Sequence, residues 1–75
     1  MKLRPIASNM TQLGTDKFEI LFSYSTPVAA YDIPNGRYYR TDHKWSRTTS
    51  KHITKWLAGA QAFERPQEWF DGLVA

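Results

Sequence analysis

Residues 37–57, RYYRTDHKWSRTTSKHITKWL, predict a strand that runs into a capped, amphipathic and basic helix. We expect the helix over residues 48–57, because apolar and cationic side chains separate on a helical wheel at about 100° per residue. The apolar side consists of Ile53, Trp56, Leu57 and Ala60, and the cationic side, nearly opposite, of Arg47, Lys51 and Lys55. Hydroxyl side chains ahead of the helix can accept hydrogen bonds from its first turn, with either Ser46 or Thr48 as the N-cap.

Positive charge is concentrated in the same stretch. Residues 37–55 carry six basic side chains and one acidic, a net charge of +5, whereas the rest of the chain carries four basic and six acidic, a net charge of −2. Free amides, the helix dipole and nearby cations also make the helix start a place where phosphate can sit. This asymmetry predicts a cationic face toward an anionic partner and disfavours an acidic, DNA-mimicking inhibitor. A solvated helix face balanced by the acidic tail is the alternative.

Composition bounds the rest of the molecule. The 75 residues are expected to form a single domain, residues 1–75, with a small core. The chain has no cysteine, which excludes disulfides and thiolate metal sites, so the fold must rest on eleven aromatic residues and a few aliphatic ones. The first residues lack the apolar region of a signal peptide, and no window approaches the ~20 apolar residues that span a bilayer. We therefore expect an intracellular protein without membrane association.

Alternation and turn residues predict four extended segments ahead of the helix. After an extended lead-in over residues 1–8, the predicted strands are residues 9–13, 18–25, 28–33 and 37–41. Turn chemistry at residues 14–17 and 34–36 predicts hairpins between neighbouring strands. One side of the second strand carries Phe18, Ile20, Phe22 and Tyr24, and we expect the basic helix to cover that side.

The tail predicts a second, shorter helix. Gly59 is suited to cap the first helix, or residues 61–63 prolong it. Pro66 is suited to the first position of a helix through Leu73, which Trp69, Phe70 and Leu73 would dock on the body. The predicted fold is therefore α+β: a small antiparallel β-meander of three or four strands, packed by one amphipathic helix, with a short C-terminal helix.

Two segments, FSYSTPVAAYD at residues 22–32 and YYRTDHKWSRTTSKHITKWL at residues 38–57, resemble a family of small phage-encoded proteins of unknown function. The similarity covers most of residues 1–57, and the tail from Gly59 onward falls outside it. The marks of the resemblance are Tyr24, Thr26-Pro27-Val28-Ala29, Tyr39-Arg40-Thr41-Asp42, Lys44-Trp45-Ser46, Thr48-Thr49-Ser50-Lys51-His52-Ile53 and Lys55-Trp56-Leu57. The resemblance implies a phage or prophage origin, hence the cytoplasm of an infected bacterial host, and no particular activity.

Catalytic and metal chemistry find little support in the residue pattern. Hydroxyls, acids and histidines occur close together around Asp42-His43 and around Ser50 and His52, but a triad needs a nucleophile, base and orienting group in contact. His43 and His52 are nine residues apart, which matches no common zinc spacing. We expect a non-catalytic protein without a metal or other cofactor, in which His52 packs at a partly exposed position or forms a hydrogen bond.

Nucleic-acid binding is the function that this pattern favours. Cations spaced along one surface suit the backbone of DNA or RNA, and aromatic rings beside them, Tyr38, Tyr39 and Trp45, suit unpaired bases. Trp45 alternatively closes the junction between strand and helix. The residues expected to bind nucleic acid or another partner are Arg37, Tyr38, Arg40, Lys44, Trp45, Arg47, Lys51 and Lys55.

The competing hypothesis is an inhibitor of a host or anti-phage defence protein, similar to an anti-CRISPR, that acts without chemistry. Its basic face would meet an acidic patch, or a strand edge and aromatic patch would form the interface. Aromatic residues make up 15% of the chain, more large rings than one small core needs. Self-association as a homodimer would explain this excess equally well.

Overall fold

The computed structural model describes residues 2–75. It contains six strands and two helices: β1 (Lys2–Ala7), β2 (Met10–Gly14), β3 (Phe18–Ser23), β4 (Thr26–Asp32), β5 (Arg37–Thr41), α1 (Arg47–Leu57), β6 (Ala62–Arg65) and α2 (Gln67–Leu73). The α+β class is confirmed, but the sheet has six strands where three or four were expected. The two additional strands lie at its two edges.

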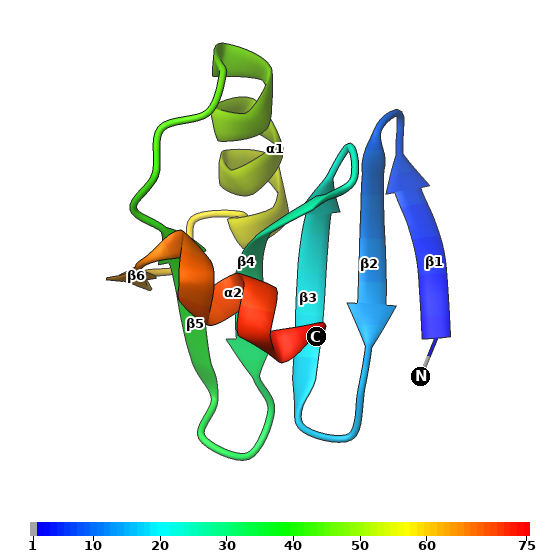
Figure 1. Ribbon diagram of the computed structural model, residues 1–75, viewed down its shortest axis with the longest axis vertical. Coiled ribbons are helices and arrows are strands. Elements are labelled where there is room, and N and C mark those ends of the chain that lie inside the picture. Colours follow the sequence, from blue (N-terminus) through cyan, green and yellow to red (C-terminus); the bar gives the residue numbers. More distant parts are fainter. Residues whose placement is uncertain (1) are drawn as a thin grey trace.

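The strands follow one another across a single sheet in the order β1-β2-β3-β4-β5-β6 (Figure 1). The first five form an antiparallel meander, whereas β6 runs parallel to β5. A parallel neighbour needs a crossover, and α1 supplies it between β5 and β6. Residues 61–63 therefore do not prolong α1 as one alternative had it, because the chain must turn back to pair with β5.

Most of the expected lead-in over residues 1–8 is strand β1. Pro5 has no backbone N–H to donate to a neighbouring strand. It is accommodated because β1 is an edge strand, with a neighbour on one side only. A register shift between Pro5 and Ala7 adds a bulge to the same edge. The two predicted turns are confirmed: residues 15–17 join β2 to β3, and residues 33–36 join β4 to β5.

Helix α1 begins and ends at local signals. Ser46 is the N-cap, and its side-chain oxygen accepts a 3.2 Å hydrogen bond from the Thr49 amide, which decides between the two candidate caps. The helix thus starts at Arg47, one residue earlier than predicted. Its C-cap is Ala58, in the left-handed conformation with φ of 51°, and not Gly59, which follows with φ of 87°. Two successive positive φ angles turn the chain toward β6, and glycine fits the second without strain.

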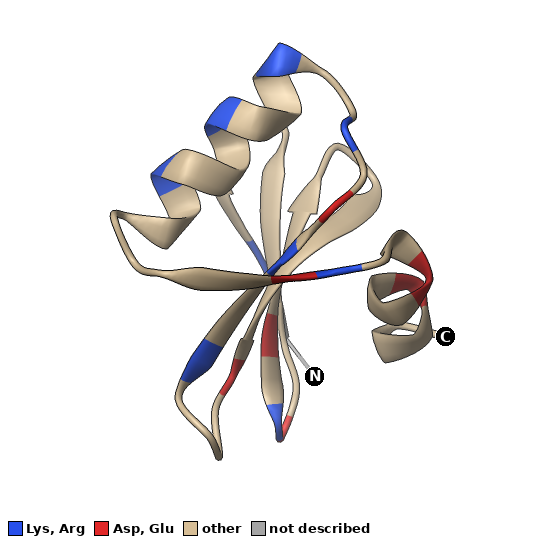
Figure 2. Cartoon of the chain, turned by 90° about the vertical axis from the view of Figure 1, so that its left-hand side faces the viewer, with Lys and Arg blue, Asp and Glu red and all other residues tan. Residues whose placement is uncertain are grey.

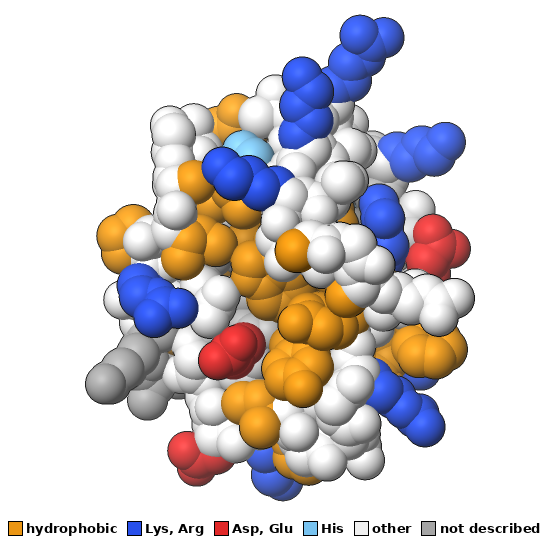
Figure 3. All heavy atoms as spheres, turned by 180° about the vertical axis from the view of Figure 1, so that it is seen from behind, with side chains coloured by type: hydrophobic (Ala, Val, Ile, Leu, Met, Phe, Trp, Pro, Cys, Tyr) orange, Lys and Arg blue, Asp and Glu red, His pale blue; other side chains and the backbone are white. Residues whose placement is uncertain are grey.

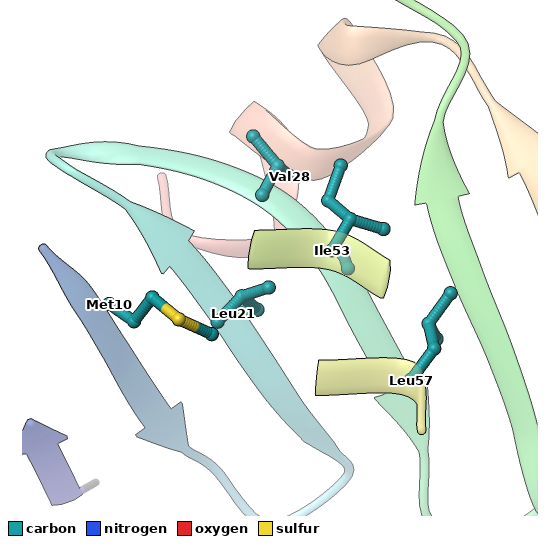
Figure 4. Packing of buried hydrophobic residues seen from close by; sticks show 6 residues of the cluster. Met10, Leu21, Val28, Ile53 and Leu57 are labelled. Atoms are coloured by element: carbon teal, nitrogen blue, oxygen red, sulfur yellow. The ribbon is translucent and has the colours of Figure 1, made fainter. Parts of the chain in front are cut away.

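The two helices cover opposite faces of the sheet, which we call the α1 face and the α2 face (Figure 2). On the α1 face, Ile53 and Leu57 pack among sheet residues in one buried cluster (Figure 4). The sheet residues of this cluster are Met10, Leu21, Val28 and Ala29. On the α2 face, Phe70 packs in a second cluster with Leu13, Ile20, Ala30 and Tyr39.

The expectation that α1 covers the aromatic side of β3 is wrong. Phe18, Ile20 and Phe22 lie on the α2 face, while α1 packs over Leu21, which is 0% exposed, and over Ser23. Tyr24 lies in the turn after the strand, with a positive φ of 58°. A central strand covered on both faces has no single buried side, so its alternation could not identify which helix lies on which face.

Helix α2 follows Pro66, which precedes it as the N-cap instead of occupying its first position. The predicted docking residues are confirmed: Trp69, Phe70 and Leu73 all belong to the α2-face cluster. Trp69 meets Phe18 edge-on, with ring centroids 5.9 Å apart. The helices of residues 2–75 have 11 and 7 residues, and neither has the length and apolar character needed to cross a bilayer.

Candidate nucleic-acid interface

Three cations form a ridge along the exposed side of α1. Arg47, Lys51 and Lys55 are exposed and four residues apart, which places them on one side of the helix. We call these three residues the cationic ridge. Figure 2 shows the basic positions following one another along α1. Because Ile53 and Leu57 are buried against the sheet, the ridge faces solvent.

A pocket of about 590 Å³ opens where β5 meets the start of α1. We call it the junction pocket. Its lining comes from β5, the following loop, α1 and β6: Arg40, Asp42, His43, Lys44, Trp45, Ser46, Arg47, Thr49, Ser50, Lys51, Ile53 and Glu64. Four of these side chains are cationic and two are carboxylates, a net charge of +2 with His43 neutral. The pocket therefore favours an anion, although Asp42 and Glu64 weaken its field.

Arg40 reaches the junction pocket from the sheet. It pairs in register with Ala29 of β4 and with Glu64 of β6, and it belongs to the α1 face. Its Nε atom is buried and has no hydrogen-bond partner among the described residues. An unpaired charged donor costs on the order of 1–3 kcal/mol or more. The buried Nε is out of reach of a ligand, so an anion in the pocket would be held by the terminal N–H groups of the guanidinium.

Trp45 forms one wall of the junction pocket and is 47% exposed, so it is not a core residue. Its indole N–H donates to Oε1 of Gln67 at 3.1 Å, and its ring lies 4.2 Å from that of His43. Gln67 also accepts from Thr41 at 2.9 Å and donates to the Pro27 carbonyl at 2.7 Å. One amide thus fixes the loop before α1 to the sheet and to α2, and it holds an exposed ring in place.

The structure brings five of the eight predicted residues together in the junction pocket, and a sixth lies beside them. Arg40, Lys44, Trp45, Arg47 and Lys51 line the pocket, and Lys55 continues the ridge by one turn. Arg37 is separated from them. Because side chains alternate along a strand, Arg37, three residues from Arg40, points to the opposite, α2 face. There its guanidinium lies 5.9 Å from the centre of the Phe63 ring.

Tyr38 and Tyr39 point to opposite faces of the sheet, as the strand pattern predicts. Tyr38 is half-buried on the α1 face and lies outside the junction pocket, with its ring centroid 5.6 Å from that of Trp56. Tyr39 is 7% exposed, packs 4.9 Å from Trp69 and lies under the guanidinium of Arg65. The expectation that Tyr39 stacks on a base is therefore wrong, because its side chain is buried and out of reach of a base.

A serine–histidine contact lies under α1. Ser23 Oγ is 2.7 Å from Nδ1 of His52 and 3.0 Å from Oγ1 of Thr49. Ser23 is 2% exposed, so a substrate carbonyl could not reach its hydroxyl, and the contact ties α1 to β3 instead. His52 is half-buried and hydrogen-bonded, which confirms the role expected for it. Within residues 2–75, no group of three His, Asp or Glu side chains is placed to hold a metal ion.

Sequence reasoning missed several members of the site. Gln67 and Glu64 come from the tail, where no local signal links them to residues 40–51. The Ser23–His52 contact spans 29 positions, so only the pairing of α1 with β3 reveals it. The sequence shows that Asp42 is acidic, but it could not predict that this side chain lines the junction pocket.

These features define a small α+β domain with a cationic helix and an adjoining pocket. The chain belongs to a family of unknown function (DUF8033), whose model matches residues 1–72. The match includes β6 and all of α2 except its last residue, Leu73, so it extends into the tail, where the resemblance noted above had stopped. No curated protein and no solved structure matches the chain.

Proposed function

We propose that the protein binds the phosphate backbone of nucleic acid through the junction pocket and the cationic ridge. The observation that carries this proposal is the gathering of four cations around one pocket: Arg40, Lys44, Arg47 and Lys51. Lys55 extends the same charge along α1. Backbone binding depends on such an array, because each cation that neutralises a phosphate releases a condensed counterion. Binding of this kind involves no chemical step.

The experiment is a titration of labelled DNA and RNA, single-stranded and duplex, at two salt concentrations. With about four phosphate contacts, affinity should fall roughly 50- to 150-fold between about 50 and about 200 mM salt. The double variant Lys51→Glu/Lys55→Glu should abolish binding. Lys17→Glu/Arg37→Glu is the matched control: it changes the net charge equally, at exposed positions away from the ridge. Absence of binding at the lower salt concentration would refute the proposal.

A second candidate function is inhibition of a host defence protein, with a phage origin as the resemblance implies. The observation that favours it is Phe63, which is 56% exposed on the edge strand β6. An open strand edge beside an exposed ring suits pairing with a partner's strand. The test is co-purification from nuclease-treated host lysate. A stoichiometric partner that Phe63→Ala loses and Lys51→Glu/Lys55→Glu retains would favour this function over the first.

A further inference from the structure

Three aromatic side chains form a row on the α1 face, beside the helix. Tyr31 of β4 and Tyr38 of β5 are cross-strand partners with ring centroids 4.5 Å apart, and the ring centroid of Trp56 on α1 lies 5.6 Å from that of Tyr38. We call these three residues the aromatic row. All three are half-buried, and Tyr38 and Trp56 pack against the α1-face core. Figure 3 shows hydrophobic side chains running down this face below a gathering of Lys and Arg.

The rings of the row are held in place before any ligand arrives. Strand pairing fixes the Tyr31–Tyr38 contact, and the Trp56 indole N–H donates to Oε1 of Gln12 at 2.9 Å. Trp56 and Tyr38 meet at an interplanar angle of 80°, an edge-to-face arrangement. Rings that are already ordered lose little conformational entropy on binding, which suits them to stack on a flat ligand.

Charge is distributed unevenly along the row. At one end, Lys55 precedes Trp56 on α1, and Lys51 lies one turn earlier. At the other end, Glu19 of β3 is the cross-strand neighbour of Tyr31. Glu19 shares a second pocket with Arg4, so the charge on the β3 side is balanced, whereas the helix side is purely cationic. An anionic backbone is therefore attracted to the helix side. A ligand that suits this surface carries negative charge along one edge and flat, stackable groups along the other.

We infer that the aromatic row stacks unpaired bases of a single-stranded nucleic acid whose phosphates lie on the cationic ridge. This inference rests on the proposed function and names its substrate class. In a duplex the bases are stacked on one another and closed to side-chain rings, so a duplex can use only the cations. The protein therefore prefers single strands, and the row supplies the difference in affinity.

The experiment measures fluorescence anisotropy of labelled oligonucleotides of about 20 nucleotides, oligo-dT, oligo-rU and a mixed-sequence duplex, at about 50 mM salt. Tyr31→Ala should weaken binding of the single strands at least about five-fold and leave duplex binding unchanged. Tyr31→Phe, which keeps the ring, should bind as the wild type does. Phe63→Ala is the matched control, since it removes an exposed ring from the α2 face. The two single-stranded arms separate a DNA preference from an RNA preference.

Ultraviolet crosslinking of oligo-dT to the wild-type protein gives a readout that needs no variant. Crosslinked peptides should contain Tyr31, Tyr38 or Trp56; crosslinks confined to Trp45 would overturn the inference. Duplex affinity equal to that of single strands, or single-strand binding unaffected by Tyr31→Ala, would overturn the inference and leave the proposed backbone binding intact. Absence of binding to every oligonucleotide would overturn both.

Discussion

Arg37 and Arg40 lie three residues apart on β5, and their side chains lie on opposite faces of the sheet. Arg40 lines the junction pocket on the α1 face, while Arg37 lies near Phe63 on the α2 face. The difference follows from the two-residue repeat of a strand, in which an odd separation reverses the side. One basic segment of sequence thus contributes charge to two separate surfaces.

This relationship supplies a matched pair of variants for nucleic-acid binding. Arg40→Gln should weaken binding roughly ten-fold, because it removes a charge-assisted contact, and should reduce the salt slope by about 0.7–0.9. Arg37→Gln removes the same charge from the other face and should change the affinity little. Salt-dependent titration of both variants is the measurement. Equal losses in the two variants would show that net charge matters and that the pocket does not.

Gln67 should be a stabilising residue, because its side chain joins four groups. It accepts from Thr41 and Trp45 and donates to Pro27 and Asp71. Gln67→Leu leaves several of these partners unsatisfied, so we expect the free energy of unfolding to fall by about 1–3 kcal/mol. Urea denaturation measures the loss. The control is Gln61→Leu at an exposed position, with an expected change within about 0.5 kcal/mol; an equal loss there would contradict the role of Gln67.

The N-cap of α1 should be worth a measurable amount of stability. Ser46→Ala removes the acceptor for the Thr49 amide and should lower the free energy of unfolding by about 0.5–2 kcal/mol. Ser46→Asp keeps an acceptor and should retain most of the stability. Ser50→Ala, at an exposed position inside the helix, serves as the control, since alanine is a better helix former there. Thermal unfolding followed by circular dichroism ranks the three variants.

Ser23 should act through its hydrogen bonds, which join α1 to β3. Ser23→Ala leaves Nδ1 of His52 without its serine partner and deprives Thr49 of one contact. We expect a loss of about 1–3 kcal/mol in the free energy of unfolding. Ser25→Ala, in the exposed turn after β3, should change stability by less than about 0.5 kcal/mol. Guanidinium denaturation measures the free energy of unfolding of both variants. If Ser23→Ala leaves it unchanged, the hydrogen bonds of Ser23 do not contribute to stability.

Features set by near neighbours could be predicted from the sequence. The capped helix, the turns at residues 15–17 and 33–36 and the apolar docking side of α2 each depend on residues within a few positions of one another. The edge strands could not be recognised this way. β1 contains a proline, and β6 has four residues with little alternation, so neither has a clear strand pattern in the sequence. Each is a strand because it forms hydrogen bonds with the neighbouring strand.

By itself the sequence determined which side of α1 is cationic, because residues four apart share a helix side whatever the rest of the chain does. It also determined that α1 begins near Ser46, where a hydroxyl can meet free amides. Only the tertiary structure decided which sheet face α1 covers, and with it the junction pocket, the Ser23–His52 contact and the aromatic row. The reason is that β3 is buried on both faces, so its alternation fits either arrangement until strand pairing and the two helices select one.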